Sequence, residues 1–127
     1  MKVTLKDIKK AQKILSEWID PSPLIRNAHL SDQFGCELYF KLENMQPIGS
    51  FKLRGATYKI SQLSDAQRAR GVIAASAGNH AQGVAWGSKQ LGVSAQIVMP
   101  KDAPLVKMQN TLNLNIVSNR QEFGLGC

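Results

Sequence analysis

The sequence predicts an α/β fold built on a mainly parallel, open sheet with helices on both faces. Short apolar segments of strand length alternate along the chain with longer segments of helical periodicity, and this order implies parallel strands joined by right-handed crossovers. In addition, a glycine-containing turn follows one apolar segment directly and opens a helix. Because open parallel sheets bind ligands at the carboxyl ends of their strands, functional residues are expected at that edge.

Capping and helix-breaking residues divide the first part of the chain into short elements. A capping box at Thr4–Asp7 and apolar residues at helical spacing predict a first helix that runs to about Trp18. The prolines of Asp20–Pro23 end that helix. After it we expect an extended piece, one or two helical turns closed by a glycine, and a strand: Leu24–Arg26, Leu30–Phe34 and Glu37–Leu42.

Helices and strands alternate in the second part. A loop at Asn44–Ser50 precedes a helix that begins at Lys52. A second capping box, at Ser64–Gln67, opens a short helix that ends at Gly71. The remaining elements are expected to be a buried strand, a helix, another strand and a helix that starts with proline: Val72–Ala75, Asn79–Leu91, Ala95–Met99 and Pro104–Leu112.

Composition indicates one modest globular domain with neither a membrane nor a nucleic acid as its partner. The 127 residues are 43% hydrophobic and 20% charged, without an apolar run near the ~18 residues of a membrane span and without a signal-peptide core. We therefore expect a cytoplasmic protein. The net charge of +7 comes from lysines scattered over helices, not from a basic tail with interleaved aromatic residues.

Cysteines and histidines form neither a disulfide framework nor a metal site by their spacing. Cys36 and Cys127 are far apart, and His29 and His80 are isolated. A cytosolic cysteine pair is usually reduced. The sequence therefore predicts no metal site built by the protein.

The most informative feature is one lysine between a small hydroxyl residue and an Arg-Gly pair. It is Lys52, in the stretch Ser50-Phe51-Lys52-Leu53-Arg54-Gly55. A lysine that forms a Schiff base must be held still and partly desolvated, and its apolar neighbours can bury the stem. Taken alone, a lysine in a helix's first turn is simply exposed to solvent, so the assignment depends on a second motif.

That second motif is Ser76-Ala77-Gly78-Asn79-His80-Ala81-Gln82-Gly83, directly after the apolar segment Val72–Ala75. Small residues between a strand and a helix leave backbone N–H groups able to hold an anion. Asn79 and His80 add side-chain donors, and Asn79 also suits a helix N-cap. An amine nucleophile and an anion-holding turn together suggest an amino-acid substrate, whose carboxylate the turn would bind.

With both motifs in place, the chain resembles the pyridoxal-phosphate (PLP) enzymes of the tryptophan-synthase-β structural class. Within this class it is most similar to the threonine dehydratases, or threonine ammonia-lyases. The stretches that carry the resemblance are Glu43–Gln46, Gly49–Ala56, Ser76–Val84, Met99-Pro100, Ala103-Pro104 and Lys107. The match runs to Leu114, so residues 1–114 are expected to be the N-terminal part of a two-domain PLP enzyme.

The resemblance implies a cofactor, a reaction and a role for each motif residue. Lys52 would be the catalytic residue, which forms the Schiff base with PLP and moves the substrate α-proton. Phe51 would border the cofactor ring, and Asn79 would contact its 3-hydroxyl. The turn would bind the substrate carboxylate through Ser76, Ala77, Gly78 and His80. Glu43 and Arg54 are expected to be structural ion-pair partners rather than catalytic groups.

The implied reaction is an elimination that converts a small amino acid to an oxo acid and ammonia. L-Threonine would give 2-oxobutanoate and L-serine would give pyruvate, with isoleucine biosynthesis as a metabolic setting and a homo-oligomer as the family-like assembly. The nearest alternative within the fold is a serine racemase. The resemblance implies that a racemase of this class has a serine, as its second acid–base group, at the position held here by Ala77. Alanine cannot transfer a proton, so the chain favours elimination.

Residues 115–127 are expected to be a tail that departs from the family pattern. Two parts that the family carries further along its chain are absent from this sequence: the Gly-rich loop that holds the PLP phosphate, and the partner of the pyridine nitrogen. The sequence therefore predicts a truncated copy with little or no deaminase activity on its own. The alternative from another functional class is a non-catalytic fragment or PLP-binding remnant.

Overall fold

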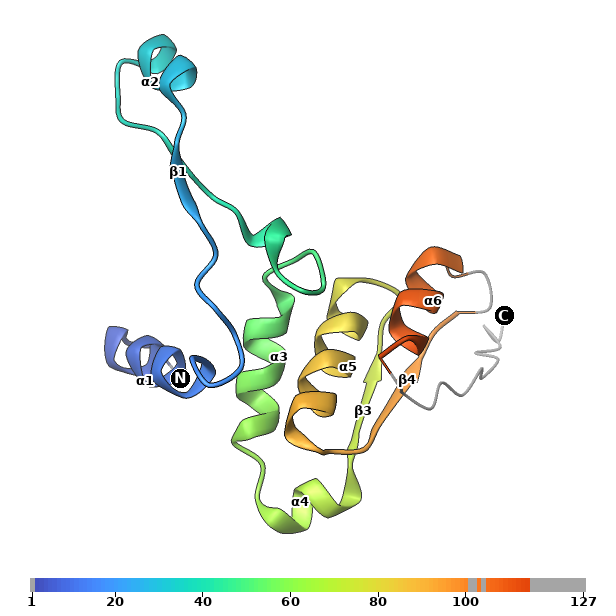
Figure 1. Cartoon of the computed structure of the whole chain (residues 1–127). Helices are drawn as coiled ribbons and strands as arrows, with labels where there is room; N and C mark the ends of the chain where they lie inside the picture. The colour runs from blue at the N-terminus through green and yellow to red at the C-terminus, as the bar shows by residue number, and fades with distance from the viewer. Residues whose placement is uncertain (1, 101–102, 104, 115–127) are drawn as a thin grey trace.

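An extended arm and a helix-covered strand pair make up the structure (Figure 1). It is a computed structural model, which describes residues 2–100, 103 and 105–114. The predicted α/β class is confirmed, because the described residues combine helices with a pair of parallel strands. The elements, in chain order, are α1 (Leu5–Leu15), β1 (Leu24–Arg26), α2 (Ala28–Phe34), β2 (Tyr39–Lys41), the 3-10 helix η1 (Glu43–Met45), α3 (Lys52–Ser61), α4 (Asp65–Arg70), β3 (Val72–Ala75), α5 (Asn79–Leu91), β4 (Ala95–Val98) and α6 (Leu105–Leu112).

Local sequence signals place most helix ends correctly. At the start of α1, the Thr4 amide donates to Asp7 Oδ2 at 2.9 Å and the Asp7 amide donates to Thr4 Oγ1 at 3.3 Å. The second predicted capping box is also present, between Ser64 and Gln67 at the start of α4. Helix α3 begins at Lys52, as the apolar spacing predicts. The predicted tail, residues 115–127, lies outside the described residues.

Strands β1 and β2 form an arm and do not join the parallel sheet. They pair antiparallel, with Leu24 opposite Lys41, and α2 lies at the tip of the arm (Figure 1). Within the predicted strand Glu37–Leu42, the structure has a strand at Tyr39–Lys41, and this strand lies outside the parallel sheet. Gly35, in the left-handed conformation at φ 63°, ends α2, and the chain then returns to pair with β1.

The other sheet is the parallel pair β3–β4, against which helix α5 packs. Val72 lies opposite Ala95 and Ala75 lies opposite Val98. Helix α5 connects the two strands and packs on both, while α3 packs closely along α5. The first turns of α3 and α5 lie at the same end of the molecule as the carboxyl ends of β3 and β4 (Figure 1).

The core consists of two clusters that meet at α3 and α5. One joins the strand pair to the helices and is centred on the fully buried Ile97 and Ala81. The other joins α1 to the helix pair and contains Leu15, Leu53 and Trp86. Leu53 is wholly removed from solvent, and a buried leucine stabilises the fold by about 1.5–3 kcal/mol. This anchor directly follows Lys52 in the chain, so it fixes the start of α3.

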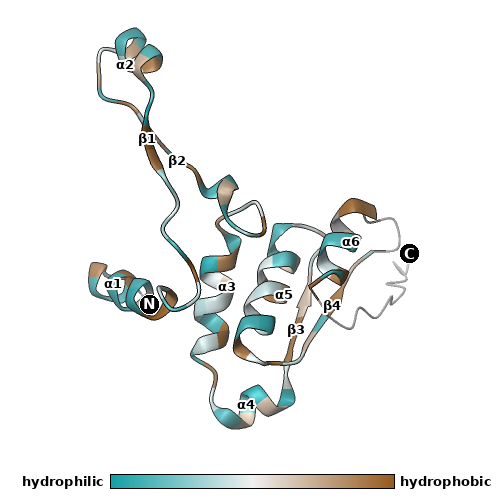
Figure 2. Ribbon diagram, in the orientation of Figure 1, coloured by the Kyte–Doolittle hydropathy of each residue, from teal (hydrophilic) through white to brown (hydrophobic). Residues whose placement is uncertain are grey.

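The prediction that Val72–Ala75 is a buried strand is wrong. Its four residues alternate between half-buried and exposed, and Ile73 is 73% exposed. Both β3 and β4 have one neighbouring strand only within the described part of the chain, but β4 alternates between buried and half-buried residues whereas Ile73 and Ala75 of β3 are exposed. Apolar strand residues are also exposed on the arm, where Figure 2 shows β1 in the hydrophobic colour.

No helix in the described ranges is long and apolar enough to cross a membrane.

Candidate active site

The loop before α3 fixes the position of Lys52. Gly49 adopts a left-handed conformation at φ 68°, and its amide donates to the Gln46 carbonyl at 2.7 Å. Ser50 is buried, and its Oγ accepts a long hydrogen bond from the Lys52 amide at 3.4 Å. A tight turn therefore directly precedes α3, and Lys52 is the first residue of this helix.

An ion pair ties this first turn to the segment before it. Arg54 Nε and Nη2 donate to the two carboxylate oxygens of Glu43, each at 2.9 Å. Ser22 Oγ donates to the same carboxylate at 2.5 Å, and Lys41 Nζ donates to the Ser22 carbonyl at 2.6 Å. The Arg54 hydrogen bond, supported by the Ser22 hydroxyl, lowers the pKa of Glu43. Arg54 and Glu43 therefore act as structural partners, and the Arg54 charge is compensated locally.

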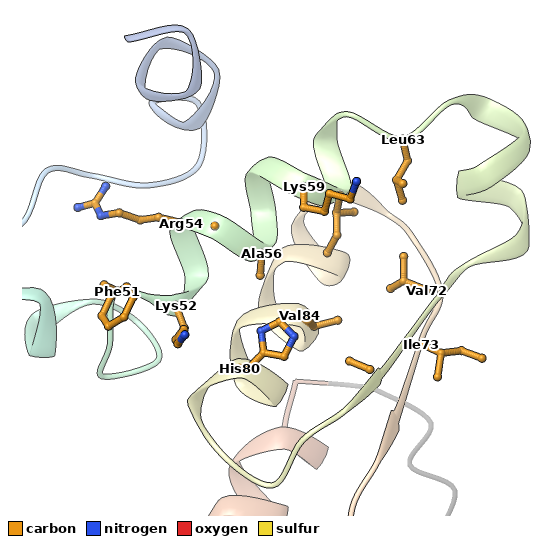
Figure 3. A pocket seen from close by; sticks show the side chains of 13 residues that line it. Phe51, Lys52, Arg54, Ala56, Lys59, Leu63, Val72, Ile73, His80 and Val84 are labelled. Carbon is orange, nitrogen blue, oxygen red and sulfur yellow. The ribbon is translucent and has the colours of Figure 1, made fainter. Parts of the chain in front are cut away.

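The Lys52 side chain reaches into an open cavity from this fixed start. Its Nζ lies 5.1 Å from the centroid of the Phe51 ring, within the range of a cation–π contact. Both side chains are exposed, so the expectation that apolar neighbours bury the Lys52 stem is wrong for these residues. Figure 3 shows them at one end of the cavity beside the His80 imidazole. The amine is therefore accessible to a small molecule.

The turn between β3 and α5 approaches the same end of the molecule. The Ser76 amide donates to the Val98 carbonyl at 3.0 Å, and the Gly78 amide donates to Ser76 Oγ at 3.2 Å. Gly78 is the N-cap of α5, with no side-chain capping bond, and Asn79 is the first helical residue. The reading of Asn79 as the N-cap is therefore wrong by one position. A helix start that no side chain caps is suited to an anion.

The cavity has a volume of about 620 Å³, which is in the range of small-molecule sites. It follows α3 away from Lys52, along Ala56 and Lys59, toward Val72 and Ile73 of β3 (Figure 3). The described residues that line it include no acidic one and four basic ones: Lys52, Arg54, Lys59 and His80. Arg54 is already paired with Glu43, so Lys52, Lys59 and His80 are the basic groups left to face a ligand. An anion with an apolar body would match this lining.

Three of the seven residues predicted to bind cofactor or substrate line this cavity, namely Phe51, Lys52 and His80. The other four lie in the adjacent turn but are not among its lining residues: Ser76, Ala77, Gly78 and Asn79. Sequence reasoning missed Lys59, although its spacing of seven residues from Lys52 places both on one helix face. It also missed the contact of Ser22 with Glu43, for which the sequence carries no local signal.

Comparison with known proteins gives a consistent result. A family model described as "Pyridoxal-phosphate dependent enzyme" matches residues 15–117. The chain is 52% identical over 112 residues to L-threonine ammonia-lyase of Thermotoga maritima, covering 88% of this chain and 28% of the relative. It is 45% identical over 108 residues to L-threo-3-hydroxyaspartate ammonia-lyase of Saccharomyces cerevisiae, covering 85% and 33%. The chain thus spans about a third of the length of these curated relatives.

Solved structures of the same group share the fold. Serine racemase from Dictyostelium discoideum superposes with a TM-score of 0.87 at 40% identity, covering 92% of this chain and 38% of that one. Threonine deaminase isoform 2 from Solanum lycopersicum superposes with a TM-score of 0.79 at 37% identity, covering 94% and 34%.

The cavity lining fits the cofactor that defines this family. PLP presents an aldehyde, an aromatic ring and an anionic phosphate, and the Lys52 end offers an accessible amine, apolar side chains and basic groups. Motifs, fold and family match agree, and the chain, which is similar to about a third of an L-threonine ammonia-lyase, belongs to the pyridoxal-phosphate dependent enzyme family.

Proposed function

We propose that this chain is the lysine-bearing part of a cytoplasmic, PLP-dependent ammonia-lyase that acts on L-threonine or L-serine. The single observation that carries the proposal is the setting of Lys52. Its amine opens into the cavity beside His80, at the start of a helix that a bidentate ion pair holds in place. A relative with 52% identity over 112 residues is named as an L-threonine ammonia-lyase, which supports the same assignment.

In this proposal, the Lys52 amine would hold the cofactor and would accept the substrate α-proton. PLP supplies the electron sink that makes this proton acidic. Phe51 limits where the ring can lie, since it is next to the amine. Asn79 Nδ2 or Oδ1, in the first turn of α5, would hydrogen-bond the ring hydroxyl.

The substrate carboxylate would bind at the turn before α5. The residues assigned to it are Ser76, Ala77, Gly78 and His80. The first-turn amides of α5, which lack a side-chain cap, favour a negative charge, and the His80 imidazole lines the cavity next to them. Binding here would place the α-carbon toward Lys52. Loss of the β-hydroxyl as water, followed by hydrolysis of the released enamine, gives 2-oxobutanoate or pyruvate and ammonia.

A serine racemase is the second candidate, because serine racemases are among the similar structures. Racemisation needs a second acid–base group on the opposite face of the substrate carbon. Ala77 has no proton to transfer, which favours elimination. The name of one relative, "L-threonine dehydratase catabolic TdcB", points to threonine breakdown as a metabolic setting beside isoleucine biosynthesis. A family-like homo-oligomer is part of the proposal.

The test is a chimera in which residues 1–114 replace the matching segment of the Thermotoga enzyme. We expect the chimera to release 2-oxobutanoate from L-threonine, and we expect Lys52→Ala to abolish this release. Lys59→Ala is the matched control, because Lys59 lies on the same helix and lines the same cavity, and it should leave turnover within a few-fold. A chimera that forms D-serine from L-serine and releases no oxo acid would favour the racemase. A folded chimera that does neither would contradict the proposal.

A further inference from the structure

Two glycines of α5 allow α3 to pack against it at backbone distance. Gly83 and Gly87 are both buried and lie one turn apart. A Cβ atom at Gly83 would lie 2.9 Å from the Lys52 carbonyl oxygen, 3.0 Å from the Lys52 carbonyl carbon and 3.3 Å from the Leu53 nitrogen. A Cβ atom at Gly87 would lie 2.7 Å from Thr57 Oγ1 and 3.0 Å from Thr57 Cα.

The two contacts differ in what they touch. At Gly83, all three nearest atoms belong to the peptide that joins Lys52 to Leu53. Backbone atoms cannot rotate away as the end of a side chain can, so a methyl group at residue 83 must displace this peptide. At Gly87, the nearest atoms are Thr57 Oγ1 and, in the backbone, Thr57 Cα and N at 3.0 and 3.2 Å. This backbone lies more than one helical turn from Lys52 along α3, so a displacement there is farther from the Lys52 amine.

The surroundings prevent α3 from yielding as a rigid body. Leu53 is fully buried in the cluster that it shares with Leu15 and Trp86. Arg54 is held by Glu43 through two hydrogen bonds. A closely packed interior with such anchors transmits a displacement locally instead of absorbing it, so the first peptide of α3 moves.

We infer that Gly83 is a positioning residue for Lys52: the missing Cβ at residue 83 sets where the Lys52 backbone rests, and thereby where its amine enters the cavity. This inference rests on the proposed function of Lys52. It assigns a role to a residue that touches neither the amine nor the cavity, since Gly83 is not among the cavity's lining residues.

The experiment compares Gly83→Ala with Gly87→Ala in the 127-residue chain. Each variant is incubated with pyridoxal 5′-phosphate, reduced with sodium borohydride and mapped by peptide mass spectrometry. Both should lower the urea midpoint, because both introduce a buried clash. A misplacement of about 1 Å can reduce a reaction about 10²-fold, so we expect Gly83→Ala to reduce the yield at Lys52 by about tenfold or more, while Gly87→Ala keeps it near the wild-type value.

A second readout needs no cofactor. Brief treatment with acetic anhydride should show a changed ratio of Lys52 to Lys59 modification in Gly83→Ala and an unchanged ratio in Gly87→Ala. Equal effects of the two variants on Lys52 would overturn the inference, because Gly83 would then be only one of two structural glycines. Labelling in the wild type that bypasses Lys52 would instead overturn the proposed function and the role of Gly83 with it.

If Gly83→Ala does not fold, the wild-type chain still decides the matter. A nuclear Overhauser contact between the Gly83 α-protons and the Leu53 amide proton is expected from the placement of these groups. Its absence in the folded chain would overturn the inference.

Discussion

Replacing Glu43 with glutamine should destabilise the fold by about 1–2 kcal/mol. Glu43 accepts two hydrogen bonds from Arg54 at 2.9 Å, and the Arg54 and Glu43 side chains are 31% and 21% exposed. A hydrogen bond to a charged group contributes about 1.5–3 kcal/mol when well shielded, whereas exposed ion pairs contribute about 0–1 kcal/mol. This partly buried pair lies between the two, and glutamine keeps one acceptor oxygen.

The same variant should flatten the dependence of stability on pH in the acidic range. Arg54, and after it Ser22, lowers the pKa of Glu43 from 4.5. Below pH 4.5 the unfolded chain therefore binds a proton at this position more readily than the folded chain does. The stabilisation is fully present above pH 4.5 and is lost as the pH falls through the lower, folded-state value. Asp7 also has a lowered pKa, but it is present in both proteins, so its effect cancels in the comparison.

The assay is urea unfolding of the wild type and Glu43→Gln at pH values from neutral to acidic. Glu37→Gln is the matched control: Glu37 pairs with Arg26 at 3.6 Å on the arm, with exposed side chains, and its loss should change stability by about 0.5 kcal/mol or less. If Glu43→Gln is no more destabilising than Glu37→Gln, or if its stability falls in acid as steeply as that of the wild type, the ion pair does not hold the start of α3.

Three further predictions concern packing, each read from the urea midpoint of the purified variant. Thr57→Val should stabilise by about 1 kcal/mol, because Thr57 Oγ1 is buried without a hydrogen-bond partner among the described residues; a loss of stability would show that the hydroxyl is satisfied. Leu53→Ala should cost about 2–5 kcal/mol at this fully buried position, and a cost below about 1 kcal/mol would contradict its anchoring role. Gly71→Ala should cost more than about 2 kcal/mol, because φ is 76° and the new Cβ would lie 2.8 Å from the Ser94 carbonyl. Gly55→Ala in α3, where nothing lies within 4 Å, should be neutral or stabilise by up to about 1 kcal/mol; equal effects of the two glycine substitutions would refute this reasoning.

Features that depend on neighbouring residues could be predicted from the sequence. The Thr4–Asp7 capping box, the glycine that ends α5 and the start of α3 at Lys52 are all present where the pattern placed them. Each is set by hydrogen bonds or backbone angles within a few residues, so a short window of sequence carries the information.

Features that depend on distant parts of the chain could not be predicted in the same way. The burial of Val72–Ala75 depends on which parts of the chain cover each face of the strand, and a run of apolar residues does not carry that information. The arm forms because β2 pairs antiparallel with β1. Segments this short could pair in either a parallel or an antiparallel orientation, so the sequence alone does not decide between them. For the candidate site, the sequence predicts Lys52 and His80 near one edge of the parallel sheet. The contact of Ser22 with Glu43 could not be predicted, because it joins residues 21 positions apart and has no local signature.

The central claim is that Lys52 is the residue that holds PLP, and reductive labelling tests it most directly. The chain is incubated with pyridoxal 5′-phosphate, reduced with borohydride and digested, and the modified peptides are quantified. Lys52 is one of eleven lysines, and we expect it to carry most of the label, which should disappear from this peptide in Lys52→Ala and persist in Lys59→Ala. Label spread evenly over the lysines, or concentrated on Lys59, would contradict the account.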